Sequence, residues 1–314
     1  MCADALQVEE QHDVVIVGAG TAGVSCALEC LDIQLDTVVF EATERPGGQL
    51  VEIPHSVRNI AVGALGDGAQ LRDSLEEATA ILGERLRRSR VVTSANLAER
   101  WVDVGATRVR GRAFVIATGT RHQYLPAAPD GAYEGDVTYL VEARPGHFVG
   151  RDVVVIGGGD SATLDALELA RDGSKVWLVH RSAELTARHD IVERVRDESR
   201  IEDLAGWELG ALEGGERLEA VVLVRHRDGQ QRRVAAGGLV VKIARVPQTD
   251  LFRGQLDLDG AGAIVVDRSL QTSRRGVFAA GDVVSGAYPR VAAAMGQGSL
   301  AARSVLRYLQ GQRL

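Results

Sequence analysis

The chain has 314 residues, a formal net charge of −7 and 25% charged residues. This length suits two domains better than a single hydrophobic core. The acidic balance argues against nucleic acid as the main partner, because a surface that follows phosphates is basic. No apolar run approaches the roughly 20 residues that cross a bilayer, and the N-terminus has no signal-peptide pattern. We therefore expect a cytoplasmic protein without a membrane partner.

The first chemical pattern is a strand, a glycine-rich turn and a helix near the N-terminus. Residues 13–17 (DVVIV) form a β-branched run that ends in 18–23 (GAGTAG), and an apolar helical pattern follows. In this turn Gly18 permits the sharp bend, Gly20 lets the backbone approach a pyrophosphate, and Gly23 allows the helix to pack closely on the strand. The helix N-terminus adds unpaired N–H groups and a positive dipole.

An acidic residue follows at the distance that such a motif requires. A second predicted strand, residues 37–40, ends in Glu41, twenty-three residues beyond Gly18. A carboxylate there is placed to accept hydrogen bonds from ribose hydroxyls. The glycines, their flanking elements and the acid together predict a dinucleotide site.

Cysteines are few, at positions 2, 26 and 30. This odd number suits a reducing compartment and provides no disulfide framework. Cys26 and Cys30 lie one turn apart on the same face of the predicted helix. We interpret them as packing residues, because a redox pair more usually reads C-x-x-C. The seven histidines show no ligand spacing, so no metal site is expected.

The glycine pattern returns in the middle of the chain. Residues 152–156 (DVVVI) end in 157–162 (GGGDSA), in which Ala162 replaces the third glycine. The next predicted strand, 175–179, ends in His180 and Arg181 rather than in an acid. A cation there suits a 2′-phosphate or adenine stacking better than a bare ribose diol. Two such sites predict two dinucleotides, and a flavin with a nicotinamide is the chemically useful pair, because hydride can pass between them.

Six motifs in a fixed order make the sequence resemble the low-molecular-weight thioredoxin reductases, class II members of the FAD/NAD(P)-binding pyridine nucleotide-disulfide oxidoreductases. The motifs are GAGTAG at 18–23, PGGQL at 46–50, FVIATGT at 114–120, GGGDSA at 157–162, GVFAAGDV at 276–283 and YPRVAAAMGQGSLAA at 288–302. The resemblance covers nearly the whole chain. It implies an α/β fold of two Rossmann-like, three-layer ββα dinucleotide-binding domains, the second inserted in the first.

The same resemblance implies domain limits and an assembly. The FAD-binding domain would be discontinuous, residues 1–121 and 243–314, and the NAD(P)-binding-like domain would be residues 122–242. A homodimer is implied as well.

The resemblance also assigns residues to FAD. They are Gly18, Gly20, Thr21, Ala22, Gly23, Glu41, Ala42, Gly48, Gln49, Leu50, Asn59, Thr118, Gly119, Gly281, Asp282, Arg290, Val291 and Ala292. Asp282 would hydrogen-bond the ribityl chain, although an aspartate there also suits a helix N-cap. The segment from Arg290 to Ala292 would present a helix N-terminus to the flavin ring, where that dipole stabilises negative charge.

The nicotinamide nucleotide is assigned to the second glycine turn and the segment after the next strand. The residues implied are Gly157, Gly159, Asp160, Ser161, Ala162, His180, Arg181 and Arg188. Relatives that use NADPH carry H-R-R-x-x-x-R here, and only the first of the three arginines, Arg181, is present at its position. Arg188 lies two residues late, as a compensating phosphate ligand or a solvated side chain. Use of NADH, of NADPH, of both or of neither stays open.

One departure from the family concerns its redox-active cysteines. The family carries a C-x-x-C about fifteen residues before the second glycine turn, and here that place reads Leu140-Val141-Glu142-Ala143. Leu140 and Ala143 occupy the two cysteine positions. Thiol chemistry needs sulfur, so we expect a reductase that does not act on thioredoxin.

The sequence therefore predicts an FAD-dependent oxidoreductase that transfers hydride from NADH or NADPH through flavin to a small organic substrate or diffusible electron acceptor. A ferredoxin or flavodoxin reductase is the alternative, although such relatives usually carry a C-terminal extension over the flavin. A flavin-dependent oxidase, or a flavin-binding scaffold with a non-functional nicotinamide site, is a third reading. Catalytic residues stay unknown; His55 and His122 are candidate proton donors or simply surface or packing histidines.

Overall fold

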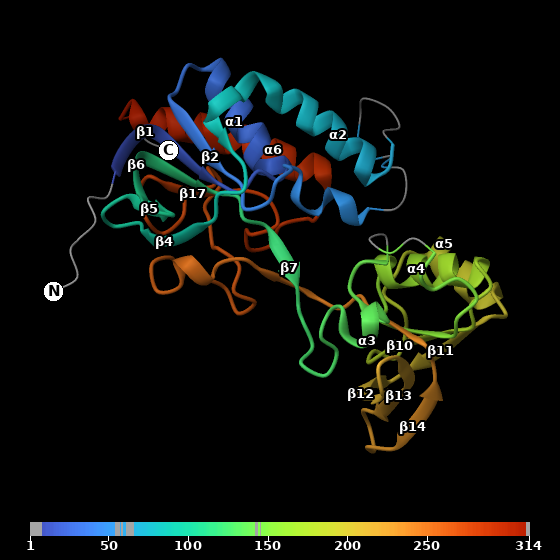
Figure 1. Ribbon diagram of the computed structural model, residues 1–314. Helices are drawn as coiled ribbons and strands as arrows, with labels where there is room; N and C mark the ends of the chain where they lie inside the picture. Colours follow the sequence, from blue (N-terminus) through green and yellow to red (C-terminus); the bar gives the residue numbers. More distant parts are fainter. Residues whose placement is uncertain are drawn as a thin grey trace. The chain divides into compact units, whose positions relative to one another are not determined.

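A computed structural model describes residues 8–53, 57, 59–60, 66–141, 144 and 146–311. The chain divides into two compact units (Figure 1). Unit 1 comprises Met1–Arg121 and Val246–Leu314, and unit 2 comprises His122–Arg245. The sequence placed the second crossing between residues 242 and 243, and the compact units separate between 245 and 246.

Unit 1 is built on a seven-stranded sheet in the order β3-β2-β1-β6-β5-β4, with β17 paired to β6. The strands are β1 (Val8–Val17), β2 (Thr37–Phe40), β3 (Leu86–Arg87), β4 (Val92–Asn96), β5 (Trp101–Val104), β6 (Thr107–Ile116) and β17 (Val277–Ala279). Strands β1, β2, β3, β6 and β17 run parallel, whereas β4, β5 and β6 pair antiparallel. The apolar run Val14–Val17 is buried in the middle of this sheet, as expected for a parallel strand covered on both faces.

Two long helices cover one face of this sheet. Helices α1 (Thr21–Asp32) and α6 (Val291–Leu309) lie side by side there (Figure 1) and share one core cluster. Their contact is close because Gly298 faces α1, where a Cβ atom would overlap the backbone carbonyl of Ala22. The other helical segments of unit 1 are η1 (Gly48–Glu52), α2 (Gly68–Ala78), η2 (Thr79–Arg85) and η4 (Asp250–Phe252).

Unit 2 has a parallel five-stranded sheet in the order β11-β10-β9-β15-β8. The strands are β8 (Val137–Thr138), β9 (Val153–Ile156), β10 (Val176–His180), β11 (Ile201–Ala205) and β15 (Gly238–Val241). Helices α4 (Asp160–Arg171) and α5 (His189–Asp197) pack on one face through a core that includes Ala166, Leu169 and Val195. The short α3 (Ala132–Gly135) precedes β8.

An antiparallel sheet covers the other face of unit 2. Its strands, β12 (Trp207–Gly214), β13 (Leu218–Arg225) and β14 (Gln231–Ala235), follow one another along the chain. Val221, Leu223 and Val234 of this sheet share a core cluster with Val154 and Val179 of the parallel sheet. Unit 2 is thus a three-layer ββα arrangement.

A buried carboxylate ties several segments of unit 2 together. Asp136 is 0% exposed and accepts hydrogen bonds from Arg217 Nε at 2.7 Å and Nη2 at 2.6 Å. The Leu218 N–H at 3.0 Å and Arg151 Nη1 at 2.8 Å contact the same carboxylate, and His147 Nε2 lies 3.0 Å away. Charge-assisted bonds of this kind are what a carboxylate needs in order to be buried.

The two chain crossings are short strands that pair with each other. Strands β7 (Thr120–His122) and β16 (Arg245–Pro247) form a two-stranded sheet. Just inside unit 2, the Gln123 N–H donates to the Ala244 carbonyl at 3.3 Å. Among the described residues, no helix combines the length and the apolar character that crossing a bilayer requires.

Candidate dinucleotide-binding sites

The register of unit 1 brings four loops to one edge of its sheet. Val17 is paired with Phe40 and with Ile116, and Ile116 is paired with Ala279. These four residues end parallel strands, so the loops that begin at residues 18, 41, 117 and 280 leave from the same side. Parallel α/β sheets bind ligands beyond the carboxyl ends of their strands.

The three glycines of the first turn have different surroundings and therefore different roles. Gly18 has φ +100°, which L side chains rarely adopt, and a Cβ there would lie 2.5 Å from the Ala117 carbonyl oxygen. A Cβ on Gly23 would overlap the Gly18 carbonyl oxygen. Gly20, by contrast, has no atom of another described residue, apart from its two chain neighbours, within 4 Å of its Cβ position. The first and third glycines therefore serve packing, while the second faces open space.

The start of α1 is left open to an anion. Gly20 is the N-cap of this helix and no side chain caps it. Thr21 is half-buried and Ala22 is buried in the first turn. Backbone N–H groups at a helix N-terminus attract phosphate, so this turn fits a dinucleotide pyrophosphate.

Glu41 is fixed above the glycine turn. Its side chain is buried, its Oε2 accepts a hydrogen bond from the Ala19 N–H at 2.8 Å, and its Oε1 accepts one from the Thr43 N–H at 2.9 Å. Thr43 Oγ1 donates a third hydrogen bond, to Oε1 at 2.7 Å. A carboxylate has about four acceptor positions, so one is left for a ribose hydroxyl. The neighbouring Ala42 is exposed.

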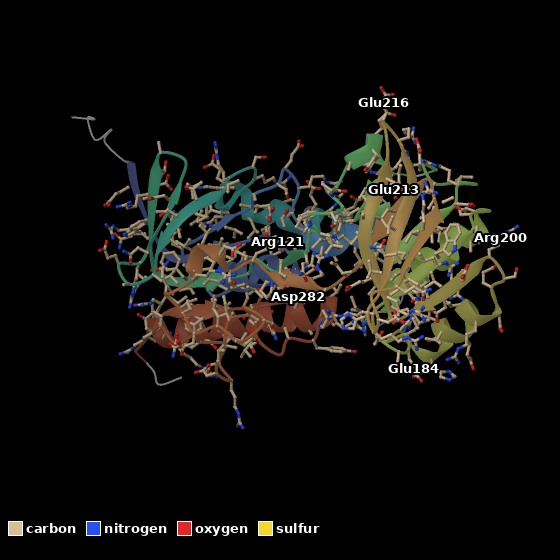
Figure 2. The ribbon with its side chains drawn as sticks, turned by 90° about the horizontal axis from the view of Figure 1, so that it is seen from below. Arg121, Glu184, Arg200, Glu213, Glu216 and Asp282 are labelled. Carbon is tan, nitrogen blue, oxygen red and sulfur yellow. The ribbon has the colours of Figure 1, made fainter. Side chains whose placement is uncertain are left out.

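Residues far apart in sequence meet beside this turn. The Gly47 N–H donates to the Ala19 carbonyl at 2.8 Å, which lays the segment from Gly47 along the first glycine turn. Gln49 Nε2 donates to Asp282 Oδ2 at 3.3 Å, across 233 residues. The same amide nitrogen lies 3.3 Å from the Cβ position of Gly119. Figure 2 labels Asp282, on the segment that follows β17.

Two further contacts hold the loops in place. Thr118 Oγ1 donates to the Gln248 carbonyl at 2.7 Å, and Gln248 Nε2 donates to the Thr118 carbonyl at 2.6 Å. The Gly281 N–H donates to Gln297 Oε1 at 2.7 Å. The sequence analysis did not include Gln297. The one feature that could have indicated it is that its side-chain amide stands alone among the small residues of α6.

The remaining residues predicted to contact FAD have varied surroundings. Leu50 is buried, Gly48 and Asn59 are exposed, and Gly281 is buried. Arg290 is the N-cap of α6, with no side-chain cap, and its guanidinium lies 4.7 Å from the Tyr288 ring centroid. Val291 and Ala292 form the first turn of that helix. The contacts of all these residues with FAD remain predictions.

The second glycine turn has the same construction in unit 2. Gly157 has φ +142°, and a Cβ there would overlap the Lys242 carbonyl oxygen and lie 2.9 Å from the Ala162 Cβ. Gly159 is the N-cap of α4, with no side-chain cap, and the nearest atom to its Cβ position is Thr186 Oγ1 at 3.9 Å. Ala162 is buried and Ser161 is exposed. This turn also fits a pyrophosphate.

The segment after β10 folds back over this turn. His180 is buried, with Nε2 2.8 Å from Asp203 Oδ1 and Nδ1 3.0 Å from Ser182 Oγ. The Thr186 N–H donates to the Gly158 carbonyl at 2.8 Å. His180 thus packs inside the fold, with both ring nitrogens engaged by protein groups.

The two predicted arginines differ in their engagement. The Arg188 N–H donates to Asp160 Oδ1 at 2.8 Å, and Arg188 Nε lies 3.3 Å from Asp160 Oδ2. Arg188 therefore neutralises a carboxylate in the first turn of α4. Arg181 is exposed beside the turn.

The candidate proton donors and cysteine positions are only partly described. His55 and Ala143 lie outside the described residues. Leu140 is half-buried. His122 has its ring centroid 5.7 Å from that of Tyr139, and its Nε2 lies 3.3 Å from Arg245 Nη1. Within the described part of the chain, no group of three or more His, Cys, Asp or Glu side chains has metal-ligand geometry.

Cys26 and Cys30 are both 0% exposed and belong to the core between α1 and α6. Their hydrogen bond, together with burial, raises the pKa of the Cys26 thiol well above its ordinary value. A buried thiol of this kind is a poor nucleophile, because the thiolate is the reactive form.

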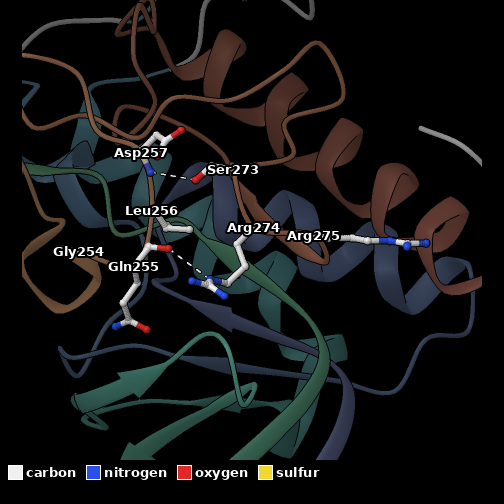
Figure 3. Close-up of a pocket in the computed structure, with 7 residues that line it drawn as sticks. All are labelled: Gly254, Gln255, Leu256, Asp257, Ser273, Arg274 and Arg275. Atoms are coloured by element: carbon white, nitrogen blue, oxygen red, sulfur yellow. Dashed lines mark hydrogen bonds between the residues drawn. The ribbon is translucent and has the colours of Figure 1, made fainter.

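A separate cavity of about 610 Å³ lies in unit 1 (Figure 3). It is lined by residues 254–257 and 273–275, where the Asp257 N–H donates to Ser273 Oγ at 3.0 Å and Arg274 Nε donates to the Gln255 carbonyl at 3.3 Å. Residues 273–275 precede the amino end of β17. This cavity is therefore not at the carboxyl edge where the dinucleotide residues gather.

Comparisons with known proteins agree with this geometry. A family model described as pyridine nucleotide-disulphide oxidoreductase matches residues 12–298. A thioredoxin reductase of Streptomyces clavuligerus is 32% identical over 308 residues, 96% of this chain and 95% of that protein. A Clostridium pasteurianum protein, described as a 34.2 kDa protein in rubredoxin operon, is 29% identical over 310 residues, 98% of this chain and 100% of that one. The crystal structure of Lactococcus lactis thioredoxin reductase matches with a TM-score of 0.86 at 26% identity, covering 96% of this chain and 99% of that chain.

Proposed function

The chain belongs to the pyridine nucleotide-disulphide oxidoreductase family, and on this premise we propose that it transfers reducing equivalents from NADH or NADPH, through FAD, to an acceptor other than thioredoxin. The acceptor proposed is a small organic substrate or a diffusible electron acceptor. The observation that carries the proposal is the pairing of two open glycine turns with the absence of a C-x-x-C from the sequence. A homodimer is part of the proposal.

Unit 1 supplies the residues that would hold FAD. The Gly18–Gly23 turn and the N-terminus of α1 would bind the pyrophosphate. Glu41 would accept a hydrogen bond from the adenosine ribose at its remaining acceptor position. Gln49 and Asp282, 3.3 Å apart, would orient the ribityl side of the flavin. The N-terminus of α6, beginning at Val291, would place a positive dipole near the ring.

Unit 2 supplies the corresponding residues for the nicotinamide nucleotide. Gly159 and the N-terminus of α4 would bind the pyrophosphate, and Arg188 would keep the Asp160 carboxylate from repelling it. Bound FAD supplies the chemistry that accepts hydride from a nicotinamide and releases electrons to the acceptor.

The cysteines argue for an acceptor other than a disulfide. The sequence has three cysteines, at positions 2, 26 and 30, and no two of them form a C-x-x-C. Cys26 and Cys30 belong to α1, and their side chains are fully buried in the core, so neither thiol can reach a protein disulfide. Disulfide exchange requires an accessible thiolate.

A second candidate function is electron transfer to a small redox protein. One specific observation favours it: the Clostridium pasteurianum relative is described as a protein in a rubredoxin operon. In this case the acceptor would dock on the protein and take electrons directly from bound flavin.

An anaerobic titration of the purified yellow protein tests these readings. We expect excess NADH or NADPH to bleach the flavin absorbance, and a quinone or a small organic acceptor to restore it rapidly. Restoration by ferredoxin, flavodoxin or rubredoxin, with quinones slow, would select the second candidate. Turnover with thioredoxin would contradict both, and a flavin that neither nucleotide bleaches would leave an oxidase or a flavin-binding scaffold.

A further inference from the structure

Helix α2 of unit 1 carries a cation that belongs to none of the six motifs. This residue is Arg72, in the second turn of the helix. It is half-buried, and its Nε atom is buried without a hydrogen-bond partner. No described side chain forms an ion pair with it. Removing a charge from water is costly and is normally offset by a partner, so Arg72 calls for an anion from elsewhere.

Close packing of α2 sets the position of this side chain. The Gly68 N–H donates to the Ile53 carbonyl at 2.8 Å, and a Cβ on Gly68 would overlap the Leu50 carbonyl oxygen. One turn further along the helix, Arg72 lies on Gly47. A Cβ on Gly47 would lie 2.7 Å from Arg72 Cγ and 3.3 Å from Arg72 Cδ. The packing of the helix therefore holds the Arg72 stem against Gly47.

Gly47 in turn lies on the first glycine turn. Its N–H donates to the Ala19 carbonyl at 2.8 Å, and it forms a parallel β-bridge with Gly20. A Cβ on the next residue, Gly48, would lie 3.4 Å from the Gly20 Cα. Arg72, Gly47 and Gly20 thus follow one another in space. The long side chain of Arg72 lies beside the turn whose open side fits a pyrophosphate.

The acids that follow Arg72 in α2 are engaged by other arginines. Asp73 Oδ1 lies 2.5 Å from Arg45 Nη2. Glu76, one turn after Arg72, accepts hydrogen bonds from Arg45 Nε and from Arg88 Nη1, each at 2.6 Å. Neither acid pairs with Arg72, although both lie on the same helix. Its counter-charge is therefore expected from a ligand.

The chemistry of a guanidinium suits a phosphate ligand. It is always charged, and its N–H groups form a planar fork that matches two phosphate oxygens. The N-terminus of α1 offers backbone N–H groups and the partial charge of the helix dipole. Arg72 would add a full positive charge beside them.

We propose that Arg72 is a further FAD-binding residue, whose guanidinium pairs with the pyrophosphate at the first glycine turn. This inference rests on the proposed binding of FAD by unit 1 and adds a ligand outside the family motifs. In the flavin-free protein the guanidinium lacks a counter-charge. Loss of its charge should therefore weaken FAD binding without weakening the fold, whereas loss of a structural arginine would weaken the fold.

The test is titration of the flavin-free full chain with FAD, followed by the quenching of flavin fluorescence. Arg72→Met keeps a side-chain stem against Gly47 and removes the charge. We expect it to weaken FAD binding at least about tenfold, because charge-assisted contacts with phosphate are each worth about that factor. Arg72→Lys, which keeps the charge without the fork, should recover part of this loss. A lysine variant no better than the methionine variant would overturn the proposal.

Two further measurements separate a pyrophosphate ligand from other roles. In urea unfolding of the flavin-free protein, Arg72→Met should have a midpoint equal to or above that of the unmodified chain, because an uncompensated charge is removed. A lower midpoint would give Arg72 a structural role. The absorption spectrum of FAD bound to Arg72→Met should be unchanged. A shifted spectrum would place the guanidinium at the flavin ring and overturn the pyrophosphate assignment.

Arg307→Met is the matched control. Arg307 is exposed in the last turn of α6, about 24 Å along the helix from Val291 at 1.5 Å per residue. Its FAD affinity should stay within about twofold of that of the unmodified protein. An equal loss of affinity in Arg307→Met and Arg72→Met would reveal a general charge effect and overturn the proposal.

The failure of this inference and that of the proposed function are distinguishable. Unchanged FAD affinity in Arg72→Met would overturn the role of Arg72 alone. The proposed function fails only if the unmodified protein binds no FAD, or if neither NADH nor NADPH bleaches the bound flavin.

Discussion

Gly20 and Gly23 belong to one motif, yet the protein around them differs completely. Gly20 has φ −69°, and no described residue beyond its chain neighbours lies near its Cβ position, whereas a Cβ on Gly23 would overlap the carbonyl oxygen of Gly18. Sequence reasoning assigned them these two tasks, backbone approach to a ligand and helix packing. Only the structure shows that no described residue of unit 1 fills the space in front of Gly20.

Substitution of the two glycines should therefore affect different properties, FAD retention for Gly20 and the free energy of unfolding for Gly23. Gly20→Val should abolish FAD retention and change the unfolding free energy of the FAD-free protein by less than about 1 kcal/mol, since an N-cap substitution costs about that much. Gly23→Ala should destabilise the FAD-free protein by about 2–3 kcal/mol, because the backbone must move apart. Urea unfolding followed by circular dichroism, with flavin absorbance after gel filtration, separates the two effects. Loss of stability in Gly20→Val equal to that in Gly23→Ala would contradict this reading.

The buried cysteines make a second prediction at this scale. In a Cys2→Ser background, iodoacetamide should label no cysteine in the native protein and both Cys26 and Cys30 in urea, because both side chains are 0% exposed. Mass spectrometry counts the labels. A Cys26→Ala, Cys30→Ala variant should also keep nucleotide-dependent flavin bleaching. Rapid native labelling, or loss of bleaching in a folded variant, would give these thiols a role.

The side-chain partners of several residues could not be predicted from the sequence. His180 follows a strand as expected, but its ring faces Asp203 and Ser182, and nothing in the sequence pairs positions 180 and 203. Arg72 lies 25 residues beyond Gly47 and matches no motif. It reaches Gly47 only because α2 packs back on the segment that follows that glycine. A glycine turn can be predicted because its residues are adjacent in the sequence. The partners of a side chain cannot, because they are distant in the sequence and are brought together only by the fold.

At the scale of elements, strands were predictable where their pattern is purely apolar. The predicted strand 37–40 coincides with β2, whereas β1 extends back to Val8 from the predicted start at residue 13. Residues 9–12 are polar, and they are held as a strand by pairing with β6, for example Glu9 with Arg108. No glycine motif in the sequence indicates the antiparallel sheet β12–β14. Its strands are stabilised by packing on the parallel sheet, which a local sequence pattern does not show.

The Asp136 carboxylate connects separate segments of unit 2 through its charge-assisted hydrogen bonds. Burial alone would raise the pKa of this carboxyl, but hydrogen bonds from Arg217, Arg151 and the Leu218 backbone outweigh it and hold the pKa well below its ordinary value. A depressed pKa in the folded state stabilises the fold above the unfolded-state pKa of about 3.9. That contribution is lost as the pH falls through the folded-state value.

Asp136→Asn should therefore destabilise unit 2 by about 1–3 kcal/mol at pH 7, because it removes the buried acceptor of the charge-assisted hydrogen bonds from Arg217 and Arg151, which are themselves partly exposed. The difference in unfolding free energy between the unmodified protein and the variant should narrow as the pH falls below about 4. Urea unfolding at several pH values from 7 to 3 measures it. Asp190→Asn, on the exposed first turn of α5, serves as the control. A difference independent of pH would show that charge is not the cause.

At the scale of the whole molecule, unit 2 begins and ends at one place. Strands β7 and β16 pair, and Gln123 is hydrogen-bonded to Ala244. The insertion of one domain in another was predictable from the order of the six motifs. The resemblance placed the second crossing around residues 243–247, and the units divide inside that segment, between 245 and 246. The exact residue was not predictable, because the segment carries no motif and is defined by its pairing partner.

A fragment of residues 122–245 should fold on its own, because its ends already meet and it has its own core clusters. We expect a single cooperative urea transition and an affinity for 5′-AMP within about threefold of that of the intact protein, since interaction energies between independent units are small. Circular dichroism and calorimetry measure both. A fragment without cooperative unfolding would show that unit 2 depends on the rest of the chain.

The pairing of β17 with β6 has a consequence for how the protein is made. Strand β6 ends at Ile116 and its partner β17 begins at Val277, so a nascent chain has finished all of unit 2 before the sheet of unit 1 can close. Domains fold as units during synthesis, and the order of assembly should thus be the inserted domain first and the enclosing domain last. In nascent chains stalled with 270 residues outside the ribosomal tunnel, residues 122–245 should be folded and resist protease, whereas residues 1–121 should be cleaved. Equal protection of both segments would mean that unit 1 assembles without its last strand and helix.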